Sequence, residues 1–450
     1  MTGWLTLPIE RWMRASSART ASLLNHVPRR VVRMHARTKL LRTLRYVHAR
    51  CASQRRAWED AGVRLSDLRS TEVLRRIPFT DAQLLADHPE RFFCVPRERL
   101  IHVVATSGTS GLQKRVYFTA EDMATQTQLI GVKLCRLEGA TRGLAIFRTM
   151  HTEWTAGRFV HRGIERAGLF GLLAGTHLSP REHIDLIKTH DINFLVGAPA
   201  FIHRMTLEAG EPLDALGVRY ILLGAQPWPE TLRGDLEAAW GATVLDAYGT
   251  SELGNVIASE CVRRDGLHVS DVDFWTEVID PETGEPLEDG KTGELVVTTL
   301  SRRGMPLVRY RTGDLVAKLP DDGRCPCGLP MGKISRIRGR IGDRLVIGAG
   351  AKVFPEEFDR AILAIPGVTD YQLVIEKEDY KDVLHLTVES AEERADMTDV
   401  LTRALLSVKY VRAHHDESGS VVLGRLRAVP CGTLSRDRPK SVRIIDKRDQ

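Results

Sequence analysis

Short apolar segments alternate with longer amphipathic segments between residue 100 and about residue 246. A helical spacing of apolar positions over residues 229–240 is an example of the amphipathic kind. Four apolar runs have the length of buried strands and lie at residues 143–147, 192–196, 220–223 and 243–246. This alternation is typical of an α/β domain with a mostly parallel sheet, so α/β is the fold class that we predict.

The pattern differs on both sides of this stretch. Residues 1–95 are mostly helical in pattern, and apolar positions recur at helical spacing over residues 38–56. Residues 268–318 contain short apolar runs separated by turn residues, which is typical of antiparallel strands. The sequence therefore predicts a helical start and, at about residues 262–335, a β-subdomain.

A domain boundary is predicted near residue 341, where the pattern restarts with a strand at residues 345–347 and a helix at residues 355–364. A chain of 450 residues is also longer than one hydrophobic core usually serves. We therefore predict a large N-terminal domain over residues 1–341 and a small α+β domain over residues 342–450.

Composition and charge are ordinary for a globular protein. Hydrophobic residues make up 43% of the chain and charged residues 27%, with 64 basic side chains against 58 acidic ones. No apolar run approaches the roughly 18 residues that a membrane span needs. The N-terminus lacks the long apolar region of a signal peptide, so we expect a cytoplasmic protein with no membrane partner.

One basic segment stands out, because residues 11–55 contain many arginines and neither Asp nor Glu. Nucleic acid or anionic lipid is one interpretation of this segment. We favour a solvated helical face, since only Trp12 and Tyr46 fall among the arginines as base-stacking platforms. No nucleic-acid partner is therefore expected.

The run of small residues from Thr106 to Lys114 is the strongest chemical signal. Gly108 and Gly111 let the backbone curl and present its N–H groups to a ligand. Hydroxyl groups and the charge of Lys114 complete a phosphate cradle; the hydroxyl residues are Thr106, Ser107, Thr109 and Ser110. The glycine spacing differs from that of the P-loop, and a Ser/Gly-rich surface loop is the alternative.

Three further segments carry groups suited to a nucleotide. Tyr248 follows a predicted strand and could stack on a base, while Thr250 could bond a phosphoryl oxygen and Glu252 could hold a hard cation. Asp314 follows another strand, where it could accept both hydroxyls of a ribose. The segment 223–226 offers a backbone edge for a flat base. Each of them taken alone is also an ordinary turn.

Taken together and in this order, the motifs resemble those of adenylate-forming enzymes of the acyl-CoA synthetase superfamily, and in particular the phenylacetate–CoA ligase branch. The resemblance runs from about residue 35 to the end. It rests on residues 106–114, 224–228, 248–252, 279–284, 293–300, 310–314, 325–328, 339–340 and 432–443.

The resemblance implies two half-reactions. A carboxylate attacks the α-phosphorus of ATP to give an acyl-adenylate and pyrophosphate, and the thiol of CoA then attacks the adenylate carbonyl. By the same resemblance, residues 107–111 hold the β- and γ-phosphates, Glu252 binds Mg²⁺, and Asp314 and Arg340 fix the ribose. The residues expected around the adenine are Gly224, Ala225, Gln226, Tyr248 and Gly249.

Lys440 lies in the C-terminal segment where the family carries a lysine that enters the active site during adenylation. The resemblance also implies that the C-terminal domain is a mobile lid that rotates between the half-reactions. Two positions depart from the family. Gly342 occupies the hinge position, where Asp or Lys is common, and Gln113 replaces the usual proline of the phosphate loop.

A structural zinc site is predicted from Cys261, His268, Cys325 and Cys327, because three thiols and one imidazole complete a tetrahedral shell. Members of the branch often carry zinc at such a set; free thiols are the alternative. The other cysteines are expected to be packing residues, and they are Cys51, Cys94, Cys135 and Cys431.

The acyl pocket is expected to use His151, Trp154, Ala198 and Pro199. The branch implies an aryl or arylacetic acid, with a short aliphatic acid or a biosynthetic intermediate as alternatives. The acceptor could also be an amine or the thiol of a carrier protein, and the basic tail could meet CoA phosphates or be solvated. A non-catalytic nucleotide-binding module is a more remote alternative. A homodimer is one assembly that we consider.

Overall fold

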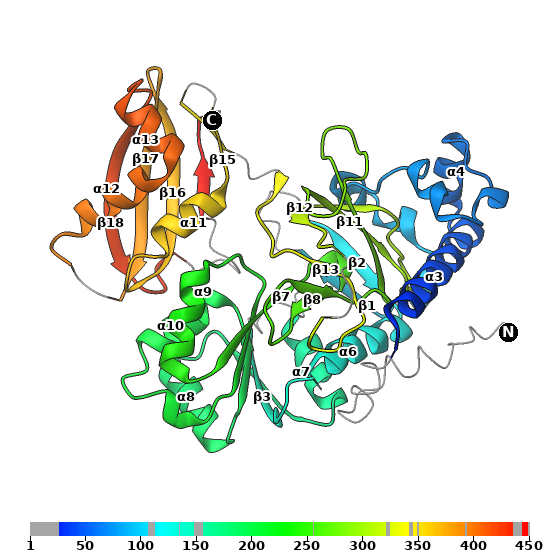
Figure 1. Ribbon diagram of the computed structural model, residues 1–450, viewed down its shortest axis with the longest axis horizontal. Helices are drawn as coiled ribbons and strands as arrows, with labels where there is room; N and C mark the ends of the chain where they lie inside the picture. The colour runs from blue at the N-terminus through cyan, green and yellow to red at the C-terminus, as the bar shows by residue number, and fades with distance from the viewer. Residues whose placement is uncertain are drawn as a thin grey trace.

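A computed structural model describes residues 27–106, 113–134, 136–147, 156–254, 256–320, 325–341, 345–348, 351–391, 394–434 and 443–448. In Figure 1 a large sheet occupies the centre, a helical segment and a second sheet lie on the right, and a separate unit at the upper left is formed by the C-terminal part of the chain.

The large sheet has eight strands in the order β13-β9-β8-β7-β6-β5-β3-β4. The half from β7 to β4 is parallel, whereas β7, β8, β9 and β13 pair antiparallel. The strands are β3 (Arg142–Phe147), β4 (Phe170–Gly175), β5 (Phe194–Gly197), β6 (Tyr220–Gly224), β7 (Thr243–Tyr248), β8 (Ala258–Glu260), β9 (Leu267–Val269) and β13 (Lys333–Ile334).

Helices cover both faces of this sheet because its strands are apolar on both sides. On β3, Leu144 and Ile146 belong to one core cluster, while Ala145 and Phe147 belong to another. The first cluster packs under α8 (Pro180–Thr189), α9 (Pro199–Leu207) and α10 (Glu230–Trp240); the second packs under α6 (Ala120–Leu134) and α7 (Ala156–Arg166).

Of the predicted helical start, residues 27–95 are described and are mostly helical, but residues 38–56 do not form one helix. The chain forms α3 (Arg29–Arg50) and α4 (Ala52–Asp60), and α5 (Ala82–Asp87) follows after several 3₁₀ turns. Cys51 separates α3 from α4 with an extended backbone at φ −111° and ψ 99°. Its thiol lies 3.0 Å from the carbonyl oxygen of Arg91, a tertiary contact that the helical spacing could not reveal.

The predicted antiparallel strands between residues 268 and 318 form a three-stranded sheet in the order β10-β11-β12. The last strand begins at Tyr310 and not at residue 307, with a register shift opposite residues 294–296. A short hairpin, β1–β2, brackets the glycine-rich run. The bounds are β1 (His102–Ala105), β2 (Arg115–Phe118), β10 (Phe274–Ile279), β11 (Thr292–Thr299) and β12 (Tyr310–Ala317).

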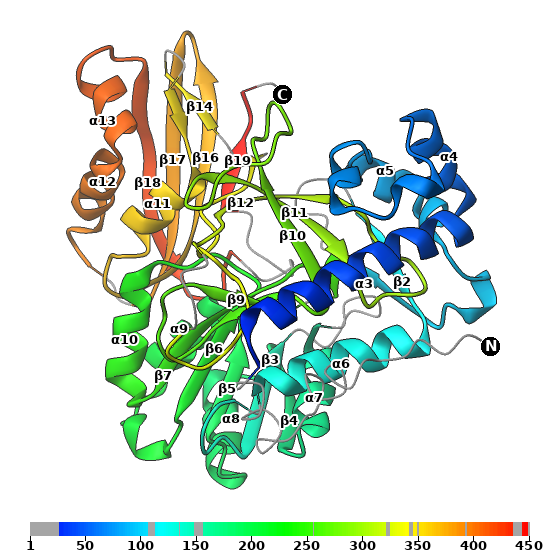
Figure 2. The same ribbon diagram turned by 45° about the vertical axis from the view of Figure 1, so that its right-hand side comes forward.

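The remaining elements form what we call the C-terminal unit, described from residue 345 to residue 448. Its four-stranded sheet has the order β18-β17-β16-β19, and the hairpin β14–β15 lies beside it (Figure 2). The elements are β14 (Leu345–Ile347), β15 (Ala351–Val353), α11 (Pro355–Ile362), β16 (Val368–Glu378), β17 (Lys381–Ser390), α12 (Met397–Ser407), α13 (Lys409–Asp416), β18 (Val421–Pro430) and β19 (Ile444–Asp446).

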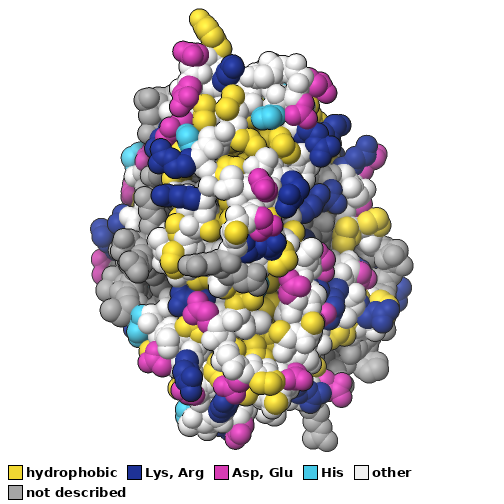
Figure 3. Space-filling view, turned by 90° about the vertical axis from the view of Figure 1, so that its left-hand side faces the viewer, with side chains coloured by type: hydrophobic (Ala, Val, Ile, Leu, Met, Phe, Trp, Pro, Cys, Tyr) yellow, Lys and Arg dark blue, Asp and Glu magenta, His cyan; other side chains and the backbone are white. Residues whose placement is uncertain are grey.

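The mixed α/β fold class is confirmed, since a large, mostly parallel sheet stands beside a separate smaller sheet. Among the described residues, no helix is long and apolar enough to cross a membrane. Figure 3 shows acidic and basic side chains interspersed over the face where the C-terminal unit sits above α9 and α10, with lysines and arginines more frequent in its upper part.

We predict that Gly143→Ala lowers the free energy of unfolding by about 1–3 kcal/mol. A Cβ atom at Gly143 would lie 2.2 Å from the ring of Phe194, so this buried ring must shift. Gly234→Ala is the matched control, because nothing lies within 4 Å of a Cβ atom there. Gly234 is an exposed position inside α10, where alanine should stabilise the helix by up to about 1 kcal/mol. A thermal midpoint of Gly143→Ala equal to or above that of wild type would contradict the close packing of Gly143 against the Phe194 ring.

Candidate active site

Two neighbouring parallel strands, β6 and β7, end at the same edge of the large sheet and deliver the first site residues. Gly224 at the end of β6 pairs with Ala247 of β7, so the segments that follow lie side by side. A Cβ atom at Gly224 would lie 2.8 Å from the carbonyl oxygen of Ala247, which leaves room for glycine alone. Ala225 adopts φ +71°, a left-handed conformation that is unusual for a residue with a Cβ.

Asp314 on β12 is brought to this edge and held by two partners. The Tyr248 hydroxyl donates to its Oδ2 at 2.6 Å, and Arg340 Nε donates to its Oδ1 at 2.6 Å. Asp314 and Tyr248 are both buried, and burial together with the Asp314 charge raises the pKa of Tyr248 well above its usual value. The two hydrogen bonds therefore hold the carboxylate at a fixed position in the interior.

Glu252 is the second buried carboxylate, in the 3₁₀ turn Ser251–Leu253 just after β7. Lys114 Nζ lies 2.6 Å from its Oε1, and the Tyr310 hydroxyl donates to the same oxygen at 2.9 Å. Burial alone would raise the pKa of Glu252, but Lys114 and the hydrogen-bond donors around it lower the pKa overall. Glu252 is therefore ionised at neutral pH despite its burial.

The backbone of the Glu252 turn has its own support. Arg302 Nη1 donates to the carbonyl oxygen of Glu252 at 2.6 Å, and its guanidinium carbon lies 4.7 Å from the centre of the Phe118 ring. Nε and Nη2 of Arg302 are buried without a hydrogen-bond partner. Arg302 lies outside every motif of the sequence, and Tyr310 is the first residue of the segment 310–314.

Thr106 and Lys114 join the two ends of the glycine-rich run. The backbone N–H of Lys114 donates to Thr106 Oγ1 at 2.9 Å, and the N–H of Thr106 donates to the carbonyl oxygen of Lys114 at 2.9 Å. The residues between them that were predicted to cradle phosphate, Ser107, Gly108, Thr109, Ser110 and Gly111, lie outside the described residues. The same holds for His151, Trp154, Gly342 and Lys440.

Other predicted residues lie at the same edge of the sheet. Ala198 and Pro199 follow β5 directly, and β5 is the neighbour of β6. Gly249 and Thr250 connect β7 to the Glu252 turn. The side-chain oxygens Gln226 Oε1 and Thr250 Oγ1 are buried and have no hydrogen-bond partner. Two buried polar atoms without partners, beside two fixed carboxylates, suit a site built for a polar ligand.

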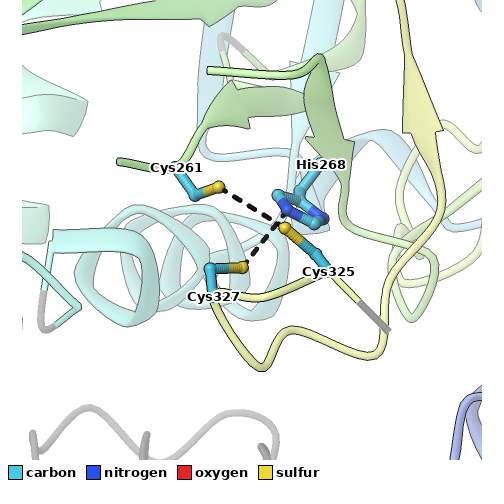
Figure 4. Close-up of side chains that lie close together, drawn as sticks. All are labelled: Cys261, His268, Cys325 and Cys327. Atoms are coloured by element: carbon cyan, nitrogen blue, oxygen red, sulfur yellow. Dashed lines mark hydrogen bonds between the residues drawn. The ribbon is translucent and has the colours of Figure 1, made fainter. Parts of the chain in front are cut away.

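A separate cluster unites the four predicted metal ligands (Figure 4). Their ligand atoms all lie within 4.8 Å of one another, with 3.8 Å between the sulfurs of Cys261 and Cys325 and 3.4 Å between the Cys327 sulfur and His268 Nε2. A tetrahedral zinc site has edges of about 3.8 Å between sulfurs and about 3.6 Å between sulfur and nitrogen. Hydrogen bonds from Cys327 and His268 lower the pKa of Cys261 to about 3, so the cluster holds a thiolate.

Three residues of the basic tail, Arg443, Lys447 and Arg448, pair with carboxylates of the C-terminal unit. Arg443 pairs with Asp359 at 2.9 Å and with Asp370 at 3.0 Å. Arg448 pairs with Asp382 at 3.0 Å. Lys447 is partly exposed and lies 3.0 Å from Glu376.

We predict that Lys114→Met lowers the free energy of unfolding by about 3–5 kcal/mol at neutral pH, because it leaves the Glu252 carboxylate buried with a single strong donor. The double variant Lys114→Met, Glu252→Gln should recover most of this loss. Urea denaturation of the single and double variants measures the coupling.

The pH dependence of the free energy of unfolding tests the charge assigned to Glu252. In wild type the pKa of Glu252 is lowered, so its stabilising contribution is present above pH ~4.3 and is lost as the pH falls. In Lys114→Met burial dominates and raises the pKa of Glu252, so the penalty grows as the pH rises above ~4.3. The gap between the two proteins should therefore close in acid; a constant gap would refute the assigned charge.

Comparisons with known proteins agree with this geometry. A family profile described as AMP-binding enzyme matches residues 19–301, and one described as AMP-binding enzyme C-terminal domain matches residues 350–448. The chain is 34% identical to a phenylacetate–coenzyme A ligase of Thermus thermophilus over 377 residues, which is 82% of this chain and 84% of the relative. It is 29% identical to a phenylacetate–coenzyme A ligase of Escherichia coli, covering 90% of this chain and 93% of the relative.

Among solved structures, 2-hydroxyisobutyryl-CoA ligase in its postadenylation state has a TM-score of 0.78 at 23% identity and covers 92% of this chain and 89% of that chain. The same ligase in its thioesterification state has a TM-score of 0.64 at 21% identity, with coverage of 92% and 89%. These likenesses concern the fold. The resemblance seen in the motifs is thereby confirmed, and the chain belongs to the family of AMP-binding, adenylate-forming enzymes.

Proposed function

We propose that this protein is an AMP-forming acid–thiol ligase that activates an aryl or arylacetic acid with ATP and transfers the acyl group to the thiol of CoA. In the first step the carboxylate oxygen bonds to the α-phosphorus and pyrophosphate leaves. In the second step the CoA sulfur bonds to the acyl carbon and AMP leaves. The observation that carries the proposal is the pair of buried, charge-paired carboxylates, Glu252 and Asp314, at the carboxyl edge of the parallel strands.

The nucleoside part of ATP is assigned to Asp314 and its neighbours. Its carboxylate is held by Tyr248 and Arg340, which suits an acceptor for two ribose hydroxyls. The adenine is assigned to the segment after β6 and to Tyr248 and Gly249. Gln226 Oε1 is a buried acceptor without a partner, as recognition of an exocyclic amino group requires.

The phosphates are assigned to Thr106, residues 107–111, Lys114 and Thr250. The hydroxyl of Thr250 is buried and has no partner, and Lys114 brings a positive charge to the same place. Glu252 fits a hard cation because it is an ionised carboxylate in the interior, and Mg²⁺ held there would offset charge on the phosphates and the leaving pyrophosphate. Lys114, which is paired with Glu252 without ligand, could then turn to a phosphate oxygen.

The acid and the lysine of the lid are assigned from the sequence. His151, Trp154, Ala198 and Pro199 form the proposed acyl pocket, and the relatives named as phenylacetate–coenzyme A ligases favour an aryl or arylacetic acid. Lys440 is proposed to bring its ammonium to the carboxylate and α-phosphate oxygens during adenylation. Positive charge at that point reduces the repulsion between two anions as they meet.

We predict that the protein, given ATP and Mg²⁺, releases pyrophosphate with phenylacetic or benzoic acids at least about tenfold faster, in kcat/KM, than with short aliphatic acids. In a pocket of aromatic size, such acids make more apolar contacts than short aliphatic acids do, and the difference corresponds to several methylene groups. The assay is a panel of acids with and without CoA. Release without thioester but with an amide product would assign an amine acceptor, and no acid-dependent release from any member of the panel would leave a binding module.

Lys440→Ala separates the two steps with the preferred acid. Adenylation should fall by about 10²-fold or more, since one electrostatic contact to a transition state is lost. Thioester formation from a supplied acyl-adenylate should remain within about threefold of wild type. Equal loss in both steps would remove the role assigned to Lys440.

The Cys/His cluster is proposed to hold a structural zinc ion. The distances of 3.8 Å between the Cys261 and Cys325 sulfurs and 3.4 Å between the Cys327 sulfur and His268 Nε2 are close to the edges of a zinc tetrahedron, and a closed four-ligand shell leaves no position for a substrate. The ligands come from β9 and from loops that flank β8 and β13, so the ion would join strands at the antiparallel end of the large sheet.

We predict about one equivalent of zinc in the purified protein and far less in Cys327→Ser. Cys431→Ser is the matched control, because Cys431 lies near Thr369 in the C-terminal unit and away from the cluster. Elemental analysis measures the metal, and removing it with a chelator should lower the thermal midpoint of wild type but hardly that of Cys327→Ser. Full zinc in Cys327→Ser would exclude this site.

A further inference from the structure

Among the described residues of the basic tail, Arg443 alone forms a hydrogen bond to a residue outside the C-terminal unit. It precedes β19, and its guanidinium is largely buried, with a side-chain exposure of 12%. Nη1 lies 2.9 Å from Asp359 of α11, and Nε lies 3.0 Å from Asp370 of β16. Tyr371 donates its hydroxyl to the same oxygen of Asp359 at 2.9 Å. The two carboxylates therefore fix the orientation of the planar Arg443 guanidinium.

The same Nη1 also donates to the carbonyl oxygen of Pro227, at 3.4 Å. Pro227 follows Gln226 in the segment after β6 that is assigned to the adenine. The C-terminal unit sits directly above α9 and α10 in Figure 1, so this bond joins the unit to the nucleotide edge of the large sheet. A guanidinium can serve two carboxylates and a carbonyl together, whereas an ammonium has no such planar fork.

The acceptor that Arg443 meets belongs to a rigid segment. The carbonyl oxygen of the next residue, Trp228, accepts from Arg336 Nη2 at 3.0 Å, and the centre of the Trp228 ring lies 4.0 Å from the guanidinium carbon of Arg336 and 4.9 Å from that of Arg233. Trp228 Nε1 also donates to Asp246 at 3.1 Å. The residue next to Pro227 is thus held by contacts within the N-terminal part.

A second contact between the C-terminal unit and the N-terminal part lies at Gly432, which precedes the stretch that contains Lys440, just as Arg443 follows it. The backbone N–H groups of Gly432 and Leu434 donate to Glu389. A Cβ atom at Gly432 would lie 3.1 Å from the guanidinium of Arg204 on α9. The stretch that contains Lys440 in sequence therefore begins and ends at residues that are fixed by carboxylates of the C-terminal unit and that lie close to the N-terminal part.

We propose that Arg443 is a positioning residue that fastens the C-terminal unit to the adenine-binding segment in the arrangement used for adenylation. The inference rests on the proposed function. Arg443 touches no reacting atom; it acts by holding the lid, and with it the segment of Lys440, at the nucleotide edge. The thioester step, which uses another arrangement of the lid, does not require the bond to Pro227.

The test compares Arg443→Gln with Arg448→Gln in the full-length protein. Arg448 is a matched control, because it is a similarly buried arginine beside the same strand whose partners, Asp382, Asp446 and Val346, all lie within the C-terminal unit. Adenylation by Arg443→Gln should fall about 10- to 100-fold, with thioester formation from supplied acyl-adenylate within about threefold. Arg448→Gln should change both steps by less than about threefold. Arg443→Lys should fall between wild type and Arg443→Gln.

Small-angle X-ray scattering of the same proteins supplies a readout that needs no turnover. With a non-reactive acyl-adenylate analogue bound, wild type and Arg448→Gln should give one distance distribution, and Arg443→Gln should give a broader one. Equal losses in both half-reactions, or unchanged adenylation together with unchanged scattering, would overturn the proposal.

If wild type adenylates no acid, the proposed function fails, and scattering of the ligand-free proteins alone decides whether Arg443 fastens the unit. If Arg443→Gln does not fold, Arg443→Lys takes its place.

Discussion

Two carboxylates in the interior are the constraint from which the arrangement of the site follows. A buried anion is tolerated only when charged or hydrogen-bonding groups surround it. Glu252 obtains Lys114 and Tyr310, and Asp314 obtains Tyr248 and Arg340. These partners come from the β1–β2 hairpin, from β7 and from β12 and the residues after it. Satisfying two charges therefore holds three separate parts of the fold at one edge of the sheet.

The two buried carboxylates also make the site suitable for a ligand that carries a cation or hydrogen-bond donors. Each carboxylate is held by two partners, so a cation or a pair of hydroxyl donors meets an acceptor that needs no reorganisation. Thr250 and Gln226 add acceptors whose partners are missing within the protein. Lys114 is paired with Glu252, so its positive charge lies beside the place proposed for the phosphates and is compensated within the protein.

Much of this was predictable from the sequence, and the limits have physical causes. The resemblance of their motifs was sufficient to assign residues 224–226 and 248–252 to one site, and the carboxyl edge that parallel strands share is the physical reason why they lie together. The four metal ligands could be predicted because thiols and imidazoles have few other reasons to cluster. Arg302 could not, because arginine is common on surfaces and only the tertiary fold places it against the carbonyl of Glu252. The break at Cys51 likewise depends on a contact 40 residues away in sequence.

The contact between the C-terminal unit and the adenine-binding segment also has a physically appropriate strength. A lid that alternates between two arrangements needs states that differ by only a few kcal/mol, because a deeper minimum would trap one of them. One hydrogen bond from a charged donor contributes about 1.5–3 kcal/mol, which shifts a two-state equilibrium roughly 10- to 150-fold. The bond at Arg443 is long, at 3.4 Å, and so belongs at the weak end of that range. Its donor is fixed by Asp359 and Asp370 and its acceptor by the surroundings of Trp228, so forming the bond orders little that is not ordered already. Such a contact favours one arrangement while leaving the other accessible, whereas an ion pair across the same interface would work against release.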